Sequence, residues 1–308
     1  MCTYICRFVI PMRKINYTVP PALDGSSVAA VLRSHGFSTA LLRSLKKTYG
    51  ALSRNGCPVR TVDPVHTGDI VAVELNTDGA TAPPSAEKAV IVYADRDILV
   101  VNKRAGMAMY ETYNHHGNAL SNAVAAAGFD GPFRPIYRLD KDTSGLVVLA
   151  RHQLSAAKLA GRVQKDYYAV VPGTYTGSGT VDAPIAHCPD STVKRQVDPA
   201  GVRAVTHWEA LGQQGGRTLL RVQLETGRTH QIRVHFAHLG TPLVGDSLYG
   251  TAPIGARHLL HCKTIRLMHP VREEPVAFDC PFPSDMEEWN QCLPTAPTTS
   301  LPASCCPP

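Results

Sequence analysis

The sequence predicts an α+β protein in two unequal parts. Strand-type and helix-type patterns alternate along the chain without an internal repeat. A stretch rich in Pro, Gly and small residues, 78–85, separates a short basic segment from a longer, nearly charge-balanced one. The 308 residues are 44% hydrophobic and 18% charged, which is ordinary globular composition and enough for two cores. A wholly disordered or fibrous chain is excluded.

Four segments follow from composition. Residues 1–78 form a small α/β domain, 79–87 a linker, 88–290 the main domain and 291–308 a tail. The tail carries no charge and five Pro, so we expect it to be disordered.

The net charge of +6 is unevenly distributed. Residues 1–78 hold nine Lys and Arg against five Asp and Glu, a net charge of +4, and 37–62 hold five bases and no acid. Such a segment suits a polyanionic partner, although a basic, simply solvated surface gives the same composition.

The first domain reads as two short helices and a small hairpin. One helix is expected from Ser27 to Leu32, and a second from Thr39 to Tyr49, capped by Ser38. In the second helix, leucines occupy one face and bases the other: Leu41, Leu42 and Leu45 against Arg43, Lys46 and Lys47. Asn55-Gly56 predicts a hairpin turn, and 66–75 ends in a strand. This pattern resembles the small S-four-like RNA-binding module, so Arg43, Lys46 and Lys47 are candidate RNA contacts.

Cysteine usage and the N-terminus favour the cytoplasm. The nine Cys are odd in number and match no paired zinc template, which suits free thiols in a reducing compartment. Arg7 interrupts the only apolar run near the N-terminus, and no apolar stretch reaches membrane-spanning length. We therefore expect no membrane partner.

A candidate catalytic carboxylate lies within 134–151. Leu146 to Ala150 is an apolar run typical of a buried strand, and Asp140 and Asp142 lie in the polar turn before it. A loop that leads into a central strand is held rigidly, which suits catalysis. The alternative is that either Asp only closes an Asx-turn.

A second polar stretch spans 224–240. A strand from Leu219 to Leu224 is followed by Arg228, and then by apolar residues at helical spacing. Arg228 therefore lies where a strand passes into a helix, beside free backbone N–H groups. His230, His235 and His238 are irregularly spaced and lack a nearby acidic ligand, so we predict no metal site.

Together these stretches resemble the RluA-type pseudouridine synthases. The R-L-D-x-x-T-S-G motif is present from Arg138 to Gly145, and G-R-x-H-Q-I-R-V-H from Gly227 to His235. Further matches are the stretch 240–250, K-x-Y-x-A at 165–169 and a weaker one, V-x-N-K-P-A-G, at 100–106. The sequence departs from the family at Tyr137, commonly His, at Arg104, commonly Pro, and at Met109-Tyr110, commonly Val-His.

The resemblance implies a fold and a reaction. The fold is a central, mostly antiparallel mixed sheet flanked by helices, and the reaction converts a uridine of RNA into pseudouridine without metal or organic cofactor. Asp140 would be the catalytic carboxylate, acting either as a nucleophile at C1′ or as a base at the ribose. Arg228 would pair with it and favour its ionised form.

The resemblance also implies RNA contacts. Tyr167 would lie against the target base, and Arg138 would fill the space left by the flipped nucleotide. Lys103, Lys141 and Arg233 are candidate phosphate contacts, with a structural role as the alternative for each.

The expected function is that of an RNA pseudouridine synthase, an isomerase, acting on ribosomal RNA or alternatively on transfer RNA. A non-catalytic RNA-binding protein that kept the fold is the alternative, but such a protein is expected to lose Asp140 or Arg228, and both are present. A hydrolase lacks its usual nucleophile motif here. We expect a monomer.

Overall fold

The computed structural model describes residues 13–75, 79–111, 117–253 and 256–293. It divides into two compact units. Unit 1 contains Met1–Tyr167 and His261–Pro281, and unit 2 contains Tyr168–Leu260 and Phe282–Pro308. In the described residues, no helix is both long and apolar enough to cross a membrane.

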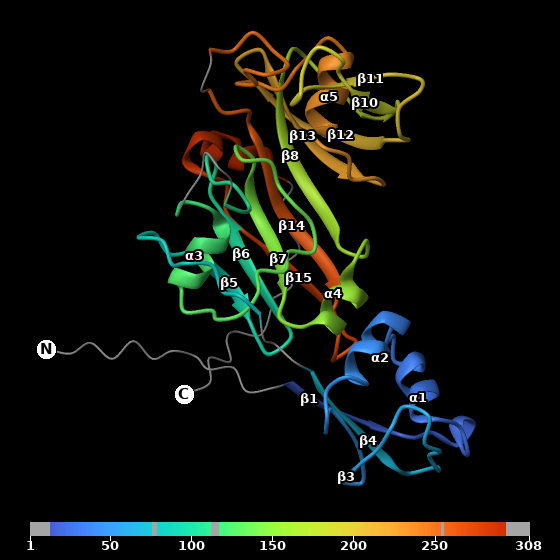
Figure 1. The fold of residues 1–308 in the computed structure, drawn as a ribbon. Coiled ribbons are helices and arrows are strands. Elements are labelled where there is room, and N and C mark those ends of the chain that lie inside the picture. Colours follow the sequence, from blue (N-terminus) through green and yellow to red (C-terminus); the bar gives the residue numbers. More distant parts are fainter. Residues whose placement is uncertain (1–12, 76–78, 112–116, 254–255, 294–308) are drawn as a thin grey trace, which may run out of the picture. The chain divides into compact units, whose positions relative to one another are not determined.

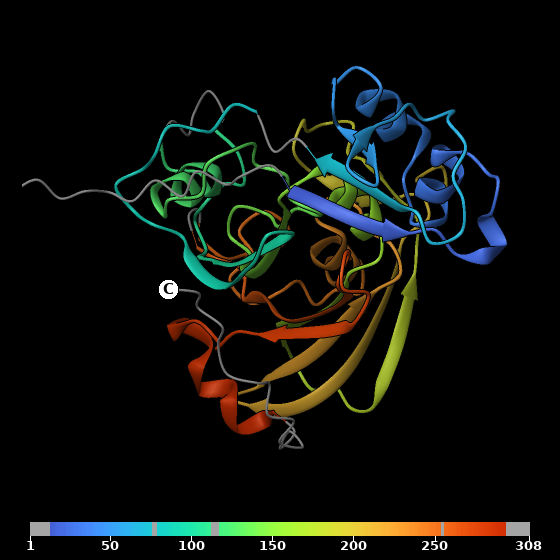
Figure 2. The same cartoon turned by 90° about the horizontal axis from the view of Figure 1, so that it is seen from below.

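Unit 1 begins with a four-stranded sheet in the order β1-β4-β2-β3. Figures 1 and 2 show β1 and β4 as neighbouring arrows, with α1 and α2 above them in Figure 1. The bounds of these first elements, in chain order, are β1 Arg13–Thr18, the 3-10 turn η1 Pro21–Leu23, α1 Val28–Ser34, α2 Thr39–Leu45, β2 Leu52–Arg54, β3 Cys57–Pro58 and β4 Ile70–Leu75.

Local signals explain these elements. The Ser38 hydroxyl accepts the N–H of Leu41 at 3.2 Å, as a helix N-cap should. The three leucines predicted to face inward are buried. However, α2 ends at Leu45 rather than at Tyr49. After the cap residue Lys46, the N–H groups of Lys47 and Thr48 bond three residues back instead of four, which tightens the chain and ends the α-helix. Asn55 and Gly56 take positive φ values, 50° and 87°, in the predicted hairpin turn.

The rest of unit 1 contains a mixed sheet in the order β5-β6-β7-β14, followed by the first half of β8, with β15 beside β14. β7 runs antiparallel to β6 and parallel to β14. The bounds are β5 Val90–Ala94, β6 Ile98–Lys103, α3 Leu120–Ala126, β7 Ser144–Ala150, α4 Gln153–Leu159, β8 Gln164–Pro172, β14 Leu260–Met268 and β15 Pro275–Asp279. Every residue of β7 is buried, as its apolar run predicted.

Unit 2 contains the second half of β8, followed by β13, β12 and β9 in antiparallel order, and a separate hairpin of β10 and β11. Its core includes Trp289 and Met286, both fully buried. The bounds are β9 Ser178–Asp182, β10 Ile185–His187, β11 Arg195–Val197, β12 Val205–Gln214, β13 Arg217–Leu224, α5 Gln231–His238 and the 3-10 helix η2 Ser284–Cys292. The predicted α+β class and mostly antiparallel mixed sheet are confirmed.

The predicted linker runs along α3. The side-chain amide of Asn122 donates to the carbonyl of Pro83 at 2.7 Å, and the Ser85 N–H donates to the Asn122 carbonyl at 3.2 Å. That residues 1–78 form a separate domain stays a prediction. Residues 294–308 of the predicted tail lie outside the described residues.

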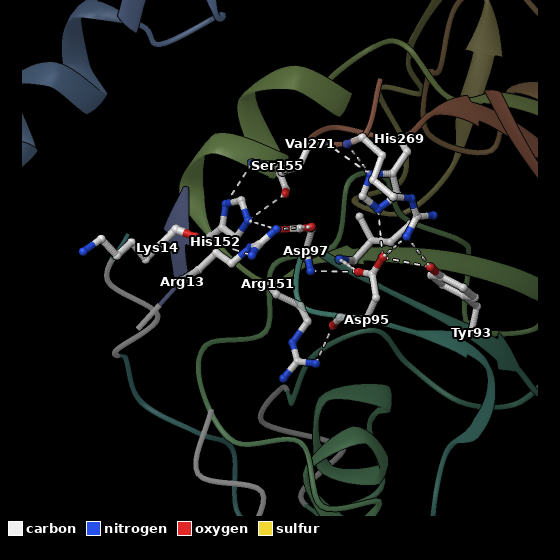
Figure 3. A network of polar contacts seen from close by, with 12 residues as sticks. Arg13, Lys14, Tyr93, Asp95, Asp97, Arg151, His152, Ser155, His269 and Val271 are labelled. Carbon is white, nitrogen blue, oxygen red and sulfur yellow. Dashed lines mark hydrogen bonds and ion pairs between the residues drawn. The ribbon is translucent and has the colours of Figure 1, made fainter. Parts of the chain in front are cut away.

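Two carboxylates anchor a buried polar network in unit 1 (Figure 3). Asp97 is 3% exposed, and its carboxylate accepts hydrogen bonds from Nε and Nη2 of Arg13 at 2.8 and 3.2 Å. The ring of His152 lies 2.9 Å from the same carboxylate. Asp95 accepts the backbone N–H groups of Asp97 and Ile98. Burial alone would raise the pKa of Asp97, but the hydrogen bonds from His152 and Arg13 outweigh it and hold that pKa below its usual value.

The same network supplies the group of possible metal ligands in the described part of the chain: Asp95, Asp97 and His269. The atoms that would bind a metal already have hydrogen-bond partners within the protein. The ring of His269 lies 2.8 Å from the Asp95 carboxylate, and Arg13 donates to the Asp97 carboxylate. We therefore interpret the group as structural.

Candidate active site

The Asp140 turn is held by the start of β7. The Thr143 N–H donates to the Asp140 carbonyl at 3.2 Å, which closes the turn. On the other side of Asp140, the Leu139 side chain is buried, with 6% exposure. Asp140 itself is half-buried. The carboxylate thus projects from a short loop fixed to a buried strand, which keeps its position nearly constant.

Gly145 explains the last position of the R-L-D-x-x-T-S-G motif. Its φ is +115°, a value that side chains rarely adopt, and it lies beside Cys262 of the parallel strand β14. An added Cβ would overlap the Cys262 carbonyl and lie 2.6 Å from the Cys262 nitrogen. The motif therefore requires Gly for the close approach of two strands.

Lys103 is buried, not available to RNA. Its side chain is fully buried, and the ammonium donates to the carbonyls of Arg104, Met107 and Lys141 at 3.0, 2.9 and 2.9 Å. These three bonds match the three hydrogens of the ammonium. The structure therefore favours the structural alternative: Lys103 ties the 104–107 loop to the residue after Asp140.

Tyr167 lies in β8 with 6% exposure. Burial raises the pKa of its phenol well above 10, and the Cys262 sulfur and the Asp140 carboxylate act in the same direction. The phenol therefore stays protonated at neutral pH. The Asp140 charge thus contributes to the raised pKa of the Tyr167 phenol.

Tyr137 and Lys165 contact each other near β7, and neither was a candidate functional residue in the sequence. The Tyr137 hydroxyl donates to the Leu146 carbonyl in β7 at 2.9 Å, and the Lys165 ammonium lies 4.7 Å from the Tyr137 ring centroid. Burial lowers the pKa of Lys165. Tyr137 immediately precedes the R-L-D-x-x-T-S-G motif and Lys165 is the first residue of K-x-Y-x-A, and these positions are the only sequence signal for them.

Arg138 and Lys141 are exposed on either side of the half-buried Asp140. Each is therefore open to a ligand that approaches the carboxylate, in keeping with the expected roles, which stay predictions.

Arg228 lies in unit 2, in the loop between β13 and α5, and is exposed. Its N–H donates to the side-chain oxygen of Gln231 at 3.0 Å, and its Nε donates to the Arg203 carbonyl at 3.1 Å. The amide of Gln231 is bonded in turn to the Val205 carbonyl, so the loop is tied to β12. Asp140 belongs to unit 1, and the predicted pairing of the two side chains stays a prediction.

Arg233 is also in unit 2, but it is 7% exposed and already engaged. Its guanidinium binds Asp246 through two nitrogens at 2.7 and 2.9 Å and lies 5.0 Å from the Tyr249 ring centroid. Such a bidentate pair uses the planar fork fully. The structural alternative is therefore favoured for Arg233, which connects α5 to the 240–250 stretch.

His235, one of the two α5 histidines weighed as zinc ligands, has protein partners on both ring nitrogens. His235 lies 2.8 Å from the Thr206 hydroxyl and 2.9 Å from the Ala183 carbonyl. Burial lowers its pKa, so the neutral ring is the stable form.

The bases predicted for the second helix are exposed. Arg43 lies in α2, and Lys46 and Lys47 follow its last residue; all three reach solvent, while the three leucines of α2 are buried. This region therefore presents cations outward, and RNA contact by these residues stays a prediction.

Comparisons with known proteins identify the class of protein to which this fold belongs. The family model for RNA pseudouridylate synthase matches residues 97–238. An uncharacterized RNA pseudouridine synthase of Bacillus subtilis is 36% identical over 82% of this chain and 94% of its own length. The ribosomal large subunit pseudouridine synthase D of Xanthomonas campestris is 36% identical over 89% of this chain and 91% of its own length.

A solved structure supports the same family assignment. The human RNA pseudouridylate synthase domain containing 1 is 27% identical, with a TM-score of 0.54 over 68% of this chain and 89% of its own. The fold is thus that of an RNA-modifying isomerase. The chain belongs to the RNA pseudouridylate synthase family, and its reaction converts uridine in RNA to pseudouridine.

Proposed function

We propose that this enzyme modifies uridine in ribosomal RNA, with Asp140 as its catalytic carboxylate. The ribosomal substrate is supported by the relative from Xanthomonas campestris, whose name assigns it to the large ribosomal subunit. We also propose that it acts as a monomer in the cytoplasm.

The observation that carries the Asp140 assignment is its placement. The carboxylate begins the turn before a fully buried strand, and its charge acts on the buried phenol of Tyr167. In the reaction the N1–C1′ bond of uridine breaks, the uracil turns, C5 bonds to C1′, and the proton lost from C5 is balanced by one gained at N1. A carboxylate beside the anomeric carbon supports the first step, as a nucleophile or as a base at the ribose.

The neighbouring side chains have distinct proposed roles. Tyr167 offers an aromatic face to the base and a protonated hydroxyl near C5. Arg138 fills the gap left by the flipped nucleotide, which offsets part of the few kcal/mol that unstacking costs. Arg228, by its place in the G-R-x-H-Q-I-R-V-H motif, is the proposed arginine that favours the ionised form of Asp140. Lys141 binds phosphates, as do three bases in or just after α2, Arg43, Lys46 and Lys47.

The test is Asp140→Asn, with Asp142→Asn as the matched control in the same turn. We expect Asp140→Asn to abolish pseudouridine formation on ribosomal RNA from cells that lack the gene, with RNA affinity nearly unchanged. Asp142→Asn should keep its activity within about tenfold of the parent enzyme. Full turnover by Asp140→Asn would refute its assignment. Mapping pseudouridines across total RNA with and without the gene identifies the substrate position, and a missing site only in transfer RNA would refute the ribosomal proposal.

A further inference from the structure

A pocket of about 580 Å³ opens in the N-terminal part of unit 1, where α2 ends and the β2–β3 hairpin returns. Its walls come from three segments: the end of α2, the start of β2 and the residues after β3. The side chains that matter here are Lys46, Tyr49, Arg60, Val62 and Asp63. The volume lies within the range of small-molecule sites and accommodates a planar base.

The pocket wall carries an aromatic ring that the fold leaves uncovered. Tyr49 is 98% exposed and Val62 is 66% exposed. In contrast, Leu45, one turn earlier, is buried in the core. Tyr49 therefore contributes little to the packing of the fold and presents a ring face to a ligand.

The charge around the pocket is positive. Lys46 and Arg60 belong to its lining, and Arg43 and Lys47 are exposed on or beside α2. The acid of the lining, Asp63, is occupied by Arg60, whose backbone N–H and Nε donate to it at 2.8 and 3.2 Å. The ligand that fits is thus a planar ring attached to anionic groups.

We propose that this pocket binds an unpaired base of the substrate RNA, stacked on Tyr49, with the adjacent phosphates on Lys46 and Arg60. The inference rests on the proposed function and extends it from phosphate attraction to recognition of a single-stranded feature. Base-paired nucleotides are stacked on their neighbours, so only an unpaired one offers both faces to a protein ring.

The test measures binding of the full chain to a single-stranded RNA that carries 2-aminopurine, and to a duplex of the same sequence. Because base stacking on an aromatic residue is sequence-tolerant and strong, Tyr49→Ala should weaken single-strand affinity by about 5- to 150-fold. Tyr49→Phe should restore the affinity, since it keeps the ring. Duplex affinity should change much less, and 2-aminopurine quenching should be lost in Tyr49→Ala alone.

Salt dependence separates stacking from charge. Tyr49→Ala should leave the slope of log affinity against log salt unchanged, whereas Lys46→Gln should reduce that slope by about 0.7. Ile70→Ala is the control, because Ile70 is an exposed apolar residue of β4 outside the pocket. Its affinity should match that of the parent protein.

Several results would overturn the inference: parental affinity in Tyr49→Ala, equal losses in the Phe and Ala variants, or equal losses on single strand and duplex. Pseudouridine formation by the parent enzyme is measured in parallel. An inactive parent contradicts the proposed function, whereas an active parent with unaltered binding in Tyr49→Ala contradicts only the pocket.

Discussion

His258 shows how one buried residue links the fold of unit 2 to pH. It is 3% exposed, and burial, reinforced by the Arg233 charge, lowers the pKa of its ring to about 3. The neutral ring is therefore native, while the unfolded chain takes up a proton below about pH 6.5. Its stabilising contribution is complete above pH 6.5 and is lost as the pH falls toward 3.

We therefore expect the free energy of unfolding to fall by up to about 1.4 kcal/mol per pH unit below pH 6.5 because of this group. In His258→Gln that dependence should flatten, as measured by urea unfolding between pH 7 and 4. His187→Gln, at an exposed position of the same unit, is the control and should follow the parent curve. An equally steep curve in His258→Gln would show that other groups cause the acid sensitivity.

At the residue scale, the sequence identified side-chain types better than their partners. Arg233 and Lys103 both belong to basic motifs, and both were candidate phosphate contacts. Their actual partners are Asp246, 13 positions along the chain, and the Lys141 carbonyl, 38 positions away. No local pattern predicts such a pairing, because it depends on the tertiary fold.

At the scale of elements, β7 depends on one glycine. The strand begins where it lies parallel to β14, and Gly145 is the point of closest approach to Cys262. Because Asp140 is attached to this strand through a short turn, a shift of the strand start moves the carboxylate.

Gly145→Ala should therefore affect both stability and catalysis. The positive φ and the overlap with the Cys262 backbone predict a loss of about 1–3 kcal/mol or more. A reduced kcat should accompany it, measured at a temperature where the variant is still folded. Gly128→Ala, also at positive φ but with open space around it, is the control for the backbone effect alone. Equal losses in both variants would contradict the role of the close approach.

Sequence signals predicted elements best where the cause is local. The Ser38 cap, the leucine face of α2 and the Asn55-Gly56 turn were all predicted, because each depends on neighbouring residues. The end of α2 was placed four residues too late. The Lys46-Lys47-Thr48-Tyr49 run is compatible with a helix, and only the observed tightening of the last turn ends it.

At the scale of the whole molecule, the N-terminal segment packs against the rest of unit 1. Leu154 of α4 is fully buried in the hydrophobic core formed mainly by N-terminal residues, and Arg13 of β1 binds Asp97. Deleting residues 1–78 would expose Leu154 and leave a buried carboxylate without its arginine. Point substitutions on the surface of α2 therefore test RNA docking more cleanly than truncation does.

The Arg13–Asp97 pair itself provides the last test. Asp97 is 3% exposed, so removal of the arginine leaves a buried charge that His152 compensates only in part. We expect Arg13→Ala to lower the free energy of unfolding by roughly 2–3 kcal/mol, below the range for fully buried pairs because His152 remains. Lys14→Ala is the matched control: its ion pair with Glu74 is 4.0 Å long and exposed, so the change should stay within about 0.5 kcal/mol. Equal effects in the two variants would mean that the buried pair does not hold the N-terminal segment in place. A selective loss in Arg13→Ala, with protease cleavage appearing between the N-terminal sheet and β5, would mean that it does.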